Sequence, residues 1–168
     1  MTTYASPPSS GQWIRPGFSA PEFRGTKADE SLAPKTNLPN VMVGGGGADH
    51  LFSPEGETTF KYNRLSDSLS TRSDIIFSFR PERDKVDISD MLWEEGIDKI
   101  NYVGDGEKLK NVGDGFLRVD NTMRITTLRV KVNEHGPDFM VKIDGRSVNK
   151  DHIIDSKNKL FVPSGLYW

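Results

Sequence analysis

The chain has 168 residues, a net charge of −2, no cysteine, and a hydrophobic share of 35%. This length fits one domain with a tail, and the balanced charge argues against nucleic-acid binding. The lack of cysteine excludes disulfides, thiolate zinc sites and a cysteine nucleophile. No apolar run approaches the roughly 20 residues that a transmembrane helix needs. Residues 1–11 also lack the basic and apolar segments of a cleaved secretory signal.

Residues 1–37 have the composition of a leader without a core. Five prolines fall there among Ser, Thr and Gly, and such a segment buries too little apolar surface to offset its ordering entropy. The composition predicts a disordered Pro/Ser-rich leader over 1–37. Four apolar residues are exceptions that could pack on the domain or on a partner: Trp13, Ile14, Phe18 and Phe23.

A glycine-rich nonapeptide follows the leader. Residues 44–52 read GGGGADHLF, which matches G-G-x-G-x-D-x-U-x, where U is a large apolar residue. The nine-residue frame places Met42, Leu51 and Phe60 in successive U positions, and Asn40, Asp49 and Thr58 in successive D positions. Apolar residues at this period predict a parallel β-roll in which each turn buries one side chain.

The nonapeptide also predicts calcium binding. Glycines such as Gly45 and Gly47 permit the positive φ angles of a tight loop, whose carbonyls can face a cation beside the Asp49 carboxylate. Calcium accepts six to eight oxygen ligands. Asn40 offers a neutral oxygen and Thr58 a weaker one, so we expect one or two weak sites. The alternative is that the four glycines form only a flexible hinge.

The rest of the chain has the alternation of β-strands. Strands are predicted around 75–79, 85–88, 99–103, 115–119, 123–132 and 138–143. A turn at 133–137 joins the last two as an antiparallel hairpin, and a short helix is expected over 89–95, ended by Gly96. The predicted fold class is therefore all-β, with a short parallel β-roll followed by a mostly antiparallel β-sandwich.

Four blocks together resemble the C-terminal domain of serralysin-type metalloproteases, whose roll is an RTX-like calcium-binding module. They are GGGGADHLF (44–52), TTFKY (58–62), SDSLSTRSDIIFSFRPERDKVDIS (66–89), and DFMVKIDG (138–145) with DHII (151–154). The resemblance implies a calcium-bound β-roll joined to a β-sandwich over 38–154, with an export signal at its end. It adds Asp67 and Asp74 as calcium ligands, although both could instead cap helices or lie in solvated turns.

The chain also departs from this pattern. Thr58 and Ser78 stand where the family has aspartate, and most of the repeat array is missing. A C-terminal extension of 14 residues, 155–168, follows the DHII block, whereas the family's export signal ends near the terminus. The expected calcium-ligand set contains Asn40, Gly45, Gly47, Asp49, Asp67 and Asp74.

No catalytic signature accompanies these blocks. The protease motif H-E-x-x-H is absent, because none of His50, His135 and His152 is followed by glutamate. Neither G-x-S-x-G nor a phosphate-binding loop occurs in the sequence. We therefore expect a protein that is not an enzyme.

Three functions remain open on this fold. The first is a calcium-binding secretion or folding module of a type I-secreted protein. The second is a secreted interaction or virulence protein that uses the scaffold without calcium, with a secretion apparatus or a host protein as partner. The third is a module that binds an acidic polysaccharide such as a polyuronate, through five cations: Arg118, Arg124, Arg129, Lys131 and Lys142. All three predict an extracellular protein without a cleaved signal peptide.

Overall fold

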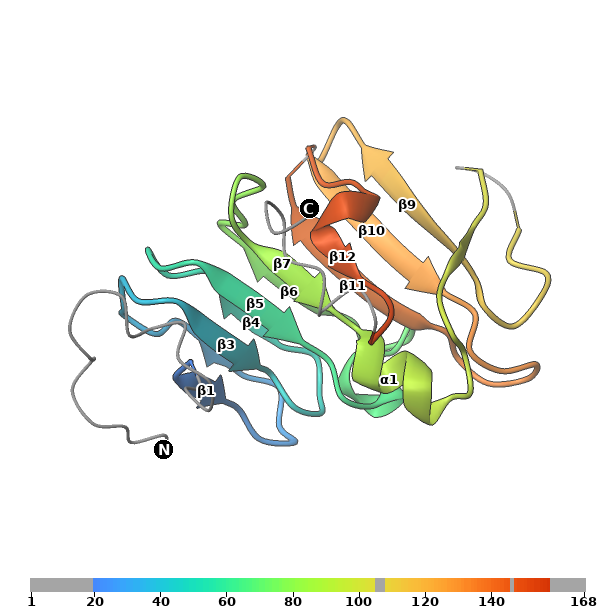
Figure 1. The fold of residues 1–168 in the computed structure, drawn as a ribbon, viewed down its shortest axis with the longest axis horizontal. Coiled ribbons are helices and arrows are strands. Elements are labelled where there is room, and N and C mark those ends of the chain that lie inside the picture. The colour runs from blue at the N-terminus through green and yellow to red at the C-terminus, as the bar shows by residue number, and fades with distance from the viewer. Residues whose placement is uncertain (1–19, 105–107, 146, 158–168) are drawn as a thin grey trace, which may run out of the picture.

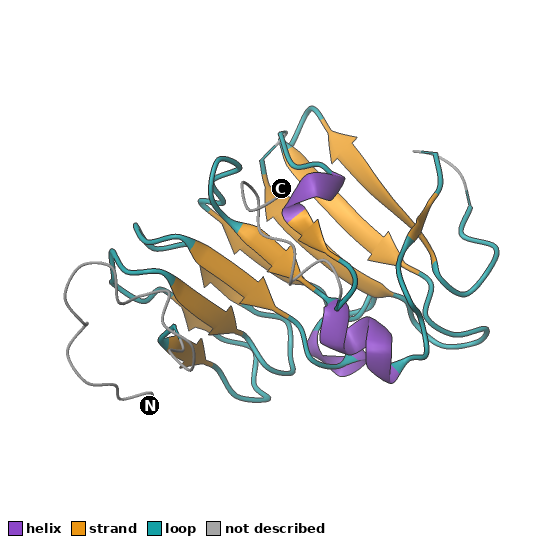
Figure 2. Cartoon of the chain, viewed as in Figure 1, coloured by secondary structure: helices purple, strands orange, loops and turns teal. Residues whose placement is uncertain are grey.

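The computed structural model of the protein describes residues 20–104, 108–145 and 147–157. It confirms the all-β class: strands dominate, and the helical segments are short (Figures 1 and 2). Strands β1 to β7 are Glu22–Arg24, Ser31–Leu32, Asn40–Val43, His50–Phe52, Thr58–Lys61, Asp74–Phe77 and Lys85–Asp87. Strands β8 to β12 are Asn101–Tyr102, Asp114–Asp120, Ile125–Val130, Phe139–Asp144 and Ile153–Ile154. The helical segments are η2 (Leu65–Asp67), α1 (Ser89–Glu94) and η3 (Lys150–His152).

Strands β1 to β7 form the predicted parallel β-roll, because successive strands alternate between two sheets. The first sheet has the order β1-β3-β5-β7-β12, and its pairings are all parallel. The second sheet begins with β2, β4 and β6, which are also parallel. Loops along one edge of the roll lead from the first sheet to the second, and loops along the other edge lead back.

The roll begins before the nonapeptide. Strands β1 and β2 lie inside the segment 1–37 that the composition predicts to be a leader, so the ordered roll starts at Glu22 and not at residue 38. Pairing of Glu22 with Val41 is a step of 19 residues, whereas pairing of Asn40 with Thr58 is a step of 18. The extra residue breaks the nine-residue frame, which explains why the frame does not reveal this turn. The apolar residues Trp13, Ile14 and Phe18 fall outside the described residues.

The predicted U positions point into the roll. Met42, Leu51 and Phe60 are each at most 1% exposed. Met42 pairs with Phe60 and Phe60 with Val86 in the first sheet, while Leu51 pairs with Ile76 in the second. Burial of each such side chain stabilises the fold by roughly 1.5–3 kcal/mol, so these paired apolar residues contribute much of the stability of the roll.

The C-terminal half extends the second sheet instead of forming a separate unit. Strand β11 pairs in parallel with β6, and β11, β10 and β9 form the expected antiparallel meander. The hairpin predicted around 133–137 is confirmed by the pairing of Leu128 with Val141. The last strand, β12, returns to the first sheet beside β7 and closes the two-layer arrangement.

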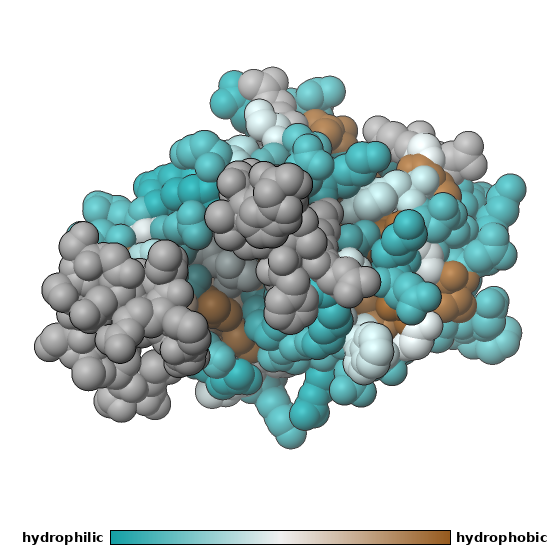
Figure 3. Space-filling view, in the orientation of Figure 1, coloured by the Kyte–Doolittle hydropathy of each residue, from teal (hydrophilic) through white to brown (hydrophobic). Residues whose placement is uncertain are grey.

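On the face drawn in Figure 3, the described side chains are mostly hydrophilic. In the view of Figure 3, apolar side chains of the described residues appear as small separate patches. Among the residues that the structure describes, Trp93 and Met123 are the most exposed large apolar side chains, at 66% and 65%. Within the described ranges, no helix has the length and apolarity to cross a membrane.

Candidate calcium site at the glycine-rich loops

Two successive loops meet at one edge of the roll. The first joins β1 to β2 over residues 25–30, and the second joins β3 to β4 over residues 44–49. Gly45 and Gly47 have φ angles of 85° and 92°, which glycine adopts without penalty. A Cβ atom on Gly45 would lie 2.3 Å from the Thr26 carbonyl oxygen, and one on Gly47 would lie 2.7 Å from that of Ala28. Glycine thus lets carbonyls of the first loop approach the second.

The glycine run contains a matched pair of test positions. Gly45→Ala should destabilise the protein by about 2 kcal/mol, because alanine resists positive φ and its methyl group would overlap the Thr26 carbonyl. Gly46→Ala is the control, since a Cβ atom there would lie 3.6 Å from its nearest neighbour. Urea unfolding of both variants measures the difference. Equal costs at the two positions would contradict this loop geometry.

Two buried aspartates lie at equivalent positions of successive turns. Asp49 and Asp74 are both 0% exposed. The backbone N–H of Glu30 donates to Asp49 Oδ1 at 3.0 Å, and the backbone N–H of Asp49 donates to Asp74 Oδ1 at 2.9 Å. Each carboxylate therefore ties its own turn to the preceding one.

The second oxygen of each carboxylate accepts no hydrogen bond of good geometry from the described residues, although the Tyr62 hydroxyl lies close enough to Asp74 to lower its pKa. Both of these Oδ2 atoms approach the same point, because a Cβ atom built on Gly44 would lie 2.7 Å from that of Asp49 and 3.3 Å from that of Asp74. Buried polar atoms normally have partners, and an exception indicates a missing water or ion. Two convergent anionic oxygens favour a cation.

The electrostatics of the pair agree with this interpretation. Burial raises the pKa of Asp49 to about 6 and that of Asp74 to about 8, and neighbouring carboxylates add to both shifts. Hydrogen bonds to the carboxylates lower both values, but less than burial raises them. The pair is therefore expensive to ionise unless a positive charge lies beside it.

Tyr62 and Asp67 complete the surroundings of the pair. Tyr62 is buried, its hydroxyl lies beside Asp74, and burial holds its pKa well above the usual value. Asp67 Oδ2 accepts from the backbone N–H groups of Asn63 and Arg64 at 2.9 and 3.1 Å. Asp67 thus closes the η2 turn, and its charge contributes to the raised pKa values of both aspartates.

The available donors suit calcium and not a transition metal. Within the described ranges, no group of three or more His, Cys, Asp or Glu side chains could hold a metal ion. A cation here would need the oxygens of Asp49 and Asp74, with main-chain carbonyls for the rest. Calcium accepts such all-oxygen, irregular sets.

Asn40 lies at the opposite edge of the roll, apart from the other five predicted ligands. Its Nδ2 donates to the Leu38 carbonyl at 3.0 Å and to Thr58 Oγ1 at 3.2 Å. The backbone N–H of Thr58 donates to Asp84 Oδ1 at 3.0 Å. Asp84 Oδ2 also accepts from Ser53 Oγ and from the Arg80 backbone. Hydrogen bonds thus link the residues at the D positions of this edge to one another. Asn40 Oδ1, however, has no donor in the described part of the chain.

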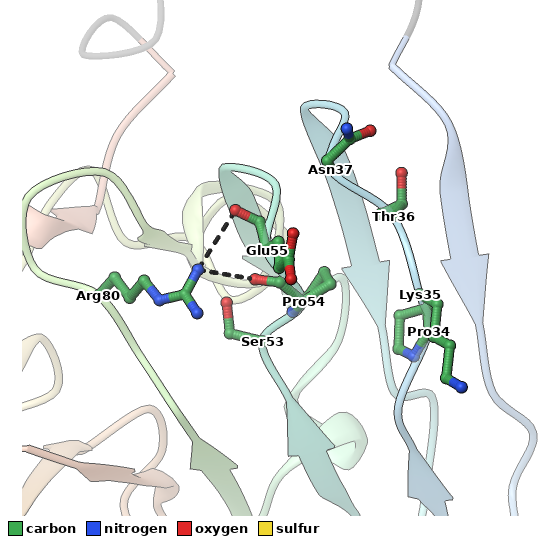
Figure 4. Close-up of a pocket in the computed structure, with 8 residues that line it drawn as sticks. All are labelled: Pro34, Lys35, Thr36, Asn37, Ser53, Pro54, Glu55 and Arg80. Carbon is green, nitrogen blue, oxygen red and sulfur yellow. Dashed lines mark hydrogen bonds between the residues drawn. The ribbon is translucent and has the colours of Figure 1, made fainter.

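A shallow groove of about 490 Å³ lies at this second edge, between the loop 34–37 and the loop 53–55 (Figure 4). Its wall includes the side chain of Arg80, which donates to the carbonyls of Pro54 and Glu55 at 3.4 and 3.3 Å. The guanidinium therefore stabilises the loop 53–55. Besides Arg80, the lining carries the opposite charges of Lys35 and Glu55.

The histidines lie on separate elements. His50 is on β4, His135 is in the loop between β10 and β11, and His152 is in η3. His152 is structural: its Nδ1 accepts from the Asn149 backbone at 3.0 Å, and its Nε2 is 2.9 Å from the Pro81 carbonyl oxygen.

Sequence reasoning missed three parts of this region. They are the first loop with Thr26, Ala28 and Glu30, the buried Tyr62, and the anchoring Asp84. The first loop could have been found by allowing a 19-residue step before the nonapeptide. Only Gly25 of that loop retains a glycine of the repeat, so the local signal is weak.

Comparisons with known proteins agree with this architecture. The family Peptidase M10 serralysin C terminal matches residues 18–154. Among solved structures, the R2 subunit of the Azotobacter vinelandii mannuronan C5-epimerase AlgE6 is similar, with a TM-score of 0.57 and 22% identity over 88% of this chain and 99% of that subunit. The R3 subunit of AlgE6 gives a TM-score of 0.53 and 21% identity over 98% and 94%.

Among curated protein sequences, none matches this chain. At such identities the two epimerase subunits establish the shared fold alone. The family match covers most of the chain, including the β-roll, the loops 25–30 and 44–49, and the antiparallel strands. The protein belongs to the peptidase M10 serralysin C-terminal family.

Proposed function

We propose that this protein is a non-catalytic accessory module of a secreted protein, and that calcium at the loops 25–30 and 44–49 completes its folded state. The observation that carries the proposal is the pair of buried Oδ2 atoms of Asp49 and Asp74, which converge and accept no hydrogen bond of good geometry from the described residues. A divalent cation beside them would offset the cost of burying two negative charges. Family membership supports calcium as that cation, because serralysin-type rolls bind it.

The structure favours one calcium region over two. Gly45, Gly47, Asp49 and Asp74 meet at one edge, with Asp67 close by. The hydrogen-bonded set of Asn40, Thr58 and Asp84 occupies the other edge. We therefore assign calcium binding to the first edge, and we expect hydrogen bonds to stabilise the second edge without calcium.

The test is calorimetric titration of the calcium-free protein with calcium chloride, with thermal unfolding beside it. Binding to the native state raises stability by RT ln(1 + [L]/Kd), about 2.7 kcal/mol at 100 times Kd. Asp49→Ala should abolish both the heat signal and the stabilisation. Magnesium is the control cation, because it demands a smaller and more regular octahedral site.

Absence of binding at millimolar calcium would remove this function. The protein would then be a calcium-independent scaffold for a secretion apparatus or a host protein. A calcium response that Asp49→Ala leaves unchanged would place the ion elsewhere in the chain.

A second function, binding of an acidic polysaccharide, is favoured by a specific observation. Lys142 pairs with Thr127, and Thr127 pairs with Arg118, so these cations lie in one row across the antiparallel strands. Arg129 lies on the same face, where its Nε is 2.7 Å from Asp138 Oδ2. The fold is also that of two subunits of a mannuronan C5-epimerase, an enzyme of acidic polysaccharide. The neighbouring row of the same face carries Asp144 and Asp120, so charge complementarity to a polyanion comes from the row of Lys142 and Arg118.

A further inference from the structure

The outer face of the second sheet carries an aromatic cluster on the β-roll. Phe52 on β4 and Phe77 on β6 are cross-strand partners, with ring centroids 4.9 Å apart and planes inclined by 16°. The His50 ring meets Phe77 edge-on at 5.4 Å. Because Leu51 and Ile76 point inward, strand alternation places His50, Phe52 and Phe77 on the outside.

The two phenylalanines of this cluster occupy outward positions of the repeat. Phe52 occupies the final x of the nonapeptide, which faces away from the core, yet both Phe52 and Phe77 are only partly covered. A cross-strand aromatic pair stabilises a sheet by roughly 0.2–1 kcal/mol. This stabilisation explains why the two rings stack, but it does not explain why Lys142 and Arg118 lie on the same face of the sheet.

The aromatic cluster continues into the cationic row. His50 pairs with Ile75, and Ile75 pairs with Lys142. From Lys142 the row runs through Thr127 to Arg118. The five strands give four interstrand steps, which span roughly 19 Å at the usual spacing. This row therefore joins His50 to two cations, and the Phe52–Phe77 pair lies on the same face two residues further along β4 and β6.

We propose that this face binds a chain of acidic sugars that runs across the strands. The apolar face of one sugar ring lies on Phe52 and Phe77, and the carboxylates of neighbouring rings pair with Lys142 and Arg118. This inference deepens the second function proposed above and depends on it. An aromatic platform selects polymers that contain rings, whereas the cations select negative charge. A polyuronate satisfies both requirements, and the balanced net charge argues against a nucleic acid, another polymer that carries rings and negative charge.

Three polymers of matched length separate the requirement for rings from the requirement for negative charge. Oligomannuronate carries rings and charge, oligoglutamate carries charge without rings, and cello-oligosaccharide carries rings without charge. Titration of the full-length protein by calorimetry and by chemical shift should give the order oligomannuronate above oligoglutamate above cello-oligosaccharide.

Two double variants test the aromatic pair and the cations separately. Phe52→Leu with Phe77→Leu keeps apolar volume but removes the rings, and it should weaken oligomannuronate roughly three- to tenfold while leaving oligoglutamate unchanged. Arg118→Gln with Lys142→Gln should weaken both anionic polymers roughly tenfold. Lys35→Gln with Lys99→Gln removes the same charge from exposed positions off this row and is the control. Circular dichroism confirms that each variant is folded.

The outcomes distinguish an error in the proposed aromatic site from an error in the polysaccharide-binding function. If no anionic polymer binds the wild-type protein, the polysaccharide function itself is wrong. If oligomannuronate binds but the leucine variant retains full affinity, the function stands and the aromatic platform is overturned. Equal affinity for oligomannuronate and oligoglutamate would also overturn it, because recognition would then be by charge alone.

Discussion

Between pH 5 and pH 8.5, the calcium-free protein should lose stability as the pH rises. Asp49 and Asp74 have folded-state pKa values raised from 3.8 to about 6 and about 8. The folded state therefore binds more protons than the unfolded state within this window, and the free energy of unfolding falls with pH. The contribution is fully present below pH about 4 and is lost as the pH passes through the two folded values. Denaturant unfolding at several pH values measures it.

Calcium should reverse the trend. Its ligands must be deprotonated, so the stabilisation that calcium gives should grow from pH 5 to pH 8.5. The carboxylates with lowered pKa values, such as Asp90 and Asp114, lose their contribution only at more acid pH. They therefore leave this window unaffected. A calcium-free protein whose stability rises across the window would contradict the buried pair.

Asp74→Asn isolates the origin of the effect. The amide keeps the shape and can still accept from the Asp49 backbone N–H, but it carries no charge. At pH 8.5 the calcium-free variant should be more stable than the wild type by on the order of 3 kcal/mol, with a flatter pH profile. It should also lose its calcium response. A variant that is less stable in calcium-free buffer would mean that the Asp74 charge is already compensated within the protein.

The opposite edge of the roll should behave differently. Asp84 is 0% exposed and accepts hydrogen bonds from Ser53 Oγ, the Thr58 backbone and the Arg80 backbone. Asp84→Ala would leave these donors without their acceptor, and it should destabilise the protein by about 3–5 kcal/mol. The loss should be the same with and without calcium, as measured by urea unfolding in both conditions.

Glu82→Ala is the matched control, because Glu82 lies in the same loop and is exposed. If calcium restores the stability of Asp84→Ala, the second edge also binds the ion, and the separation of roles between the edges is wrong. Together, Asp74→Asn and Asp84→Ala test whether one edge depends on a cation and the other on internal hydrogen bonds.

The sequence by itself determined the features that depend on local pattern. The nonapeptide gave the parallel roll and the inward positions of Met42, Leu51 and Phe60, because their spacing equals half a turn. Period-two alternation gave the hairpin of β10 and β11. These predictions succeeded because the residues that specify them are neighbours in the chain.

Only the tertiary structure decided which distant residues meet. The start of the roll at Glu22 depends on a 19-residue step and on pairing with β3, which no local frame reveals. Asn40 and Asp49 occupy the same repeat position, yet alternation between sheets sends them to opposite edges. The convergence of Asp49 on Asp74 requires the register of β4 with β6, 25 residues apart. The aromatic and cationic row likewise exists only because β11 pairs with β6. Register joins remote side chains, and it is set by packing of the whole core rather than by any one segment.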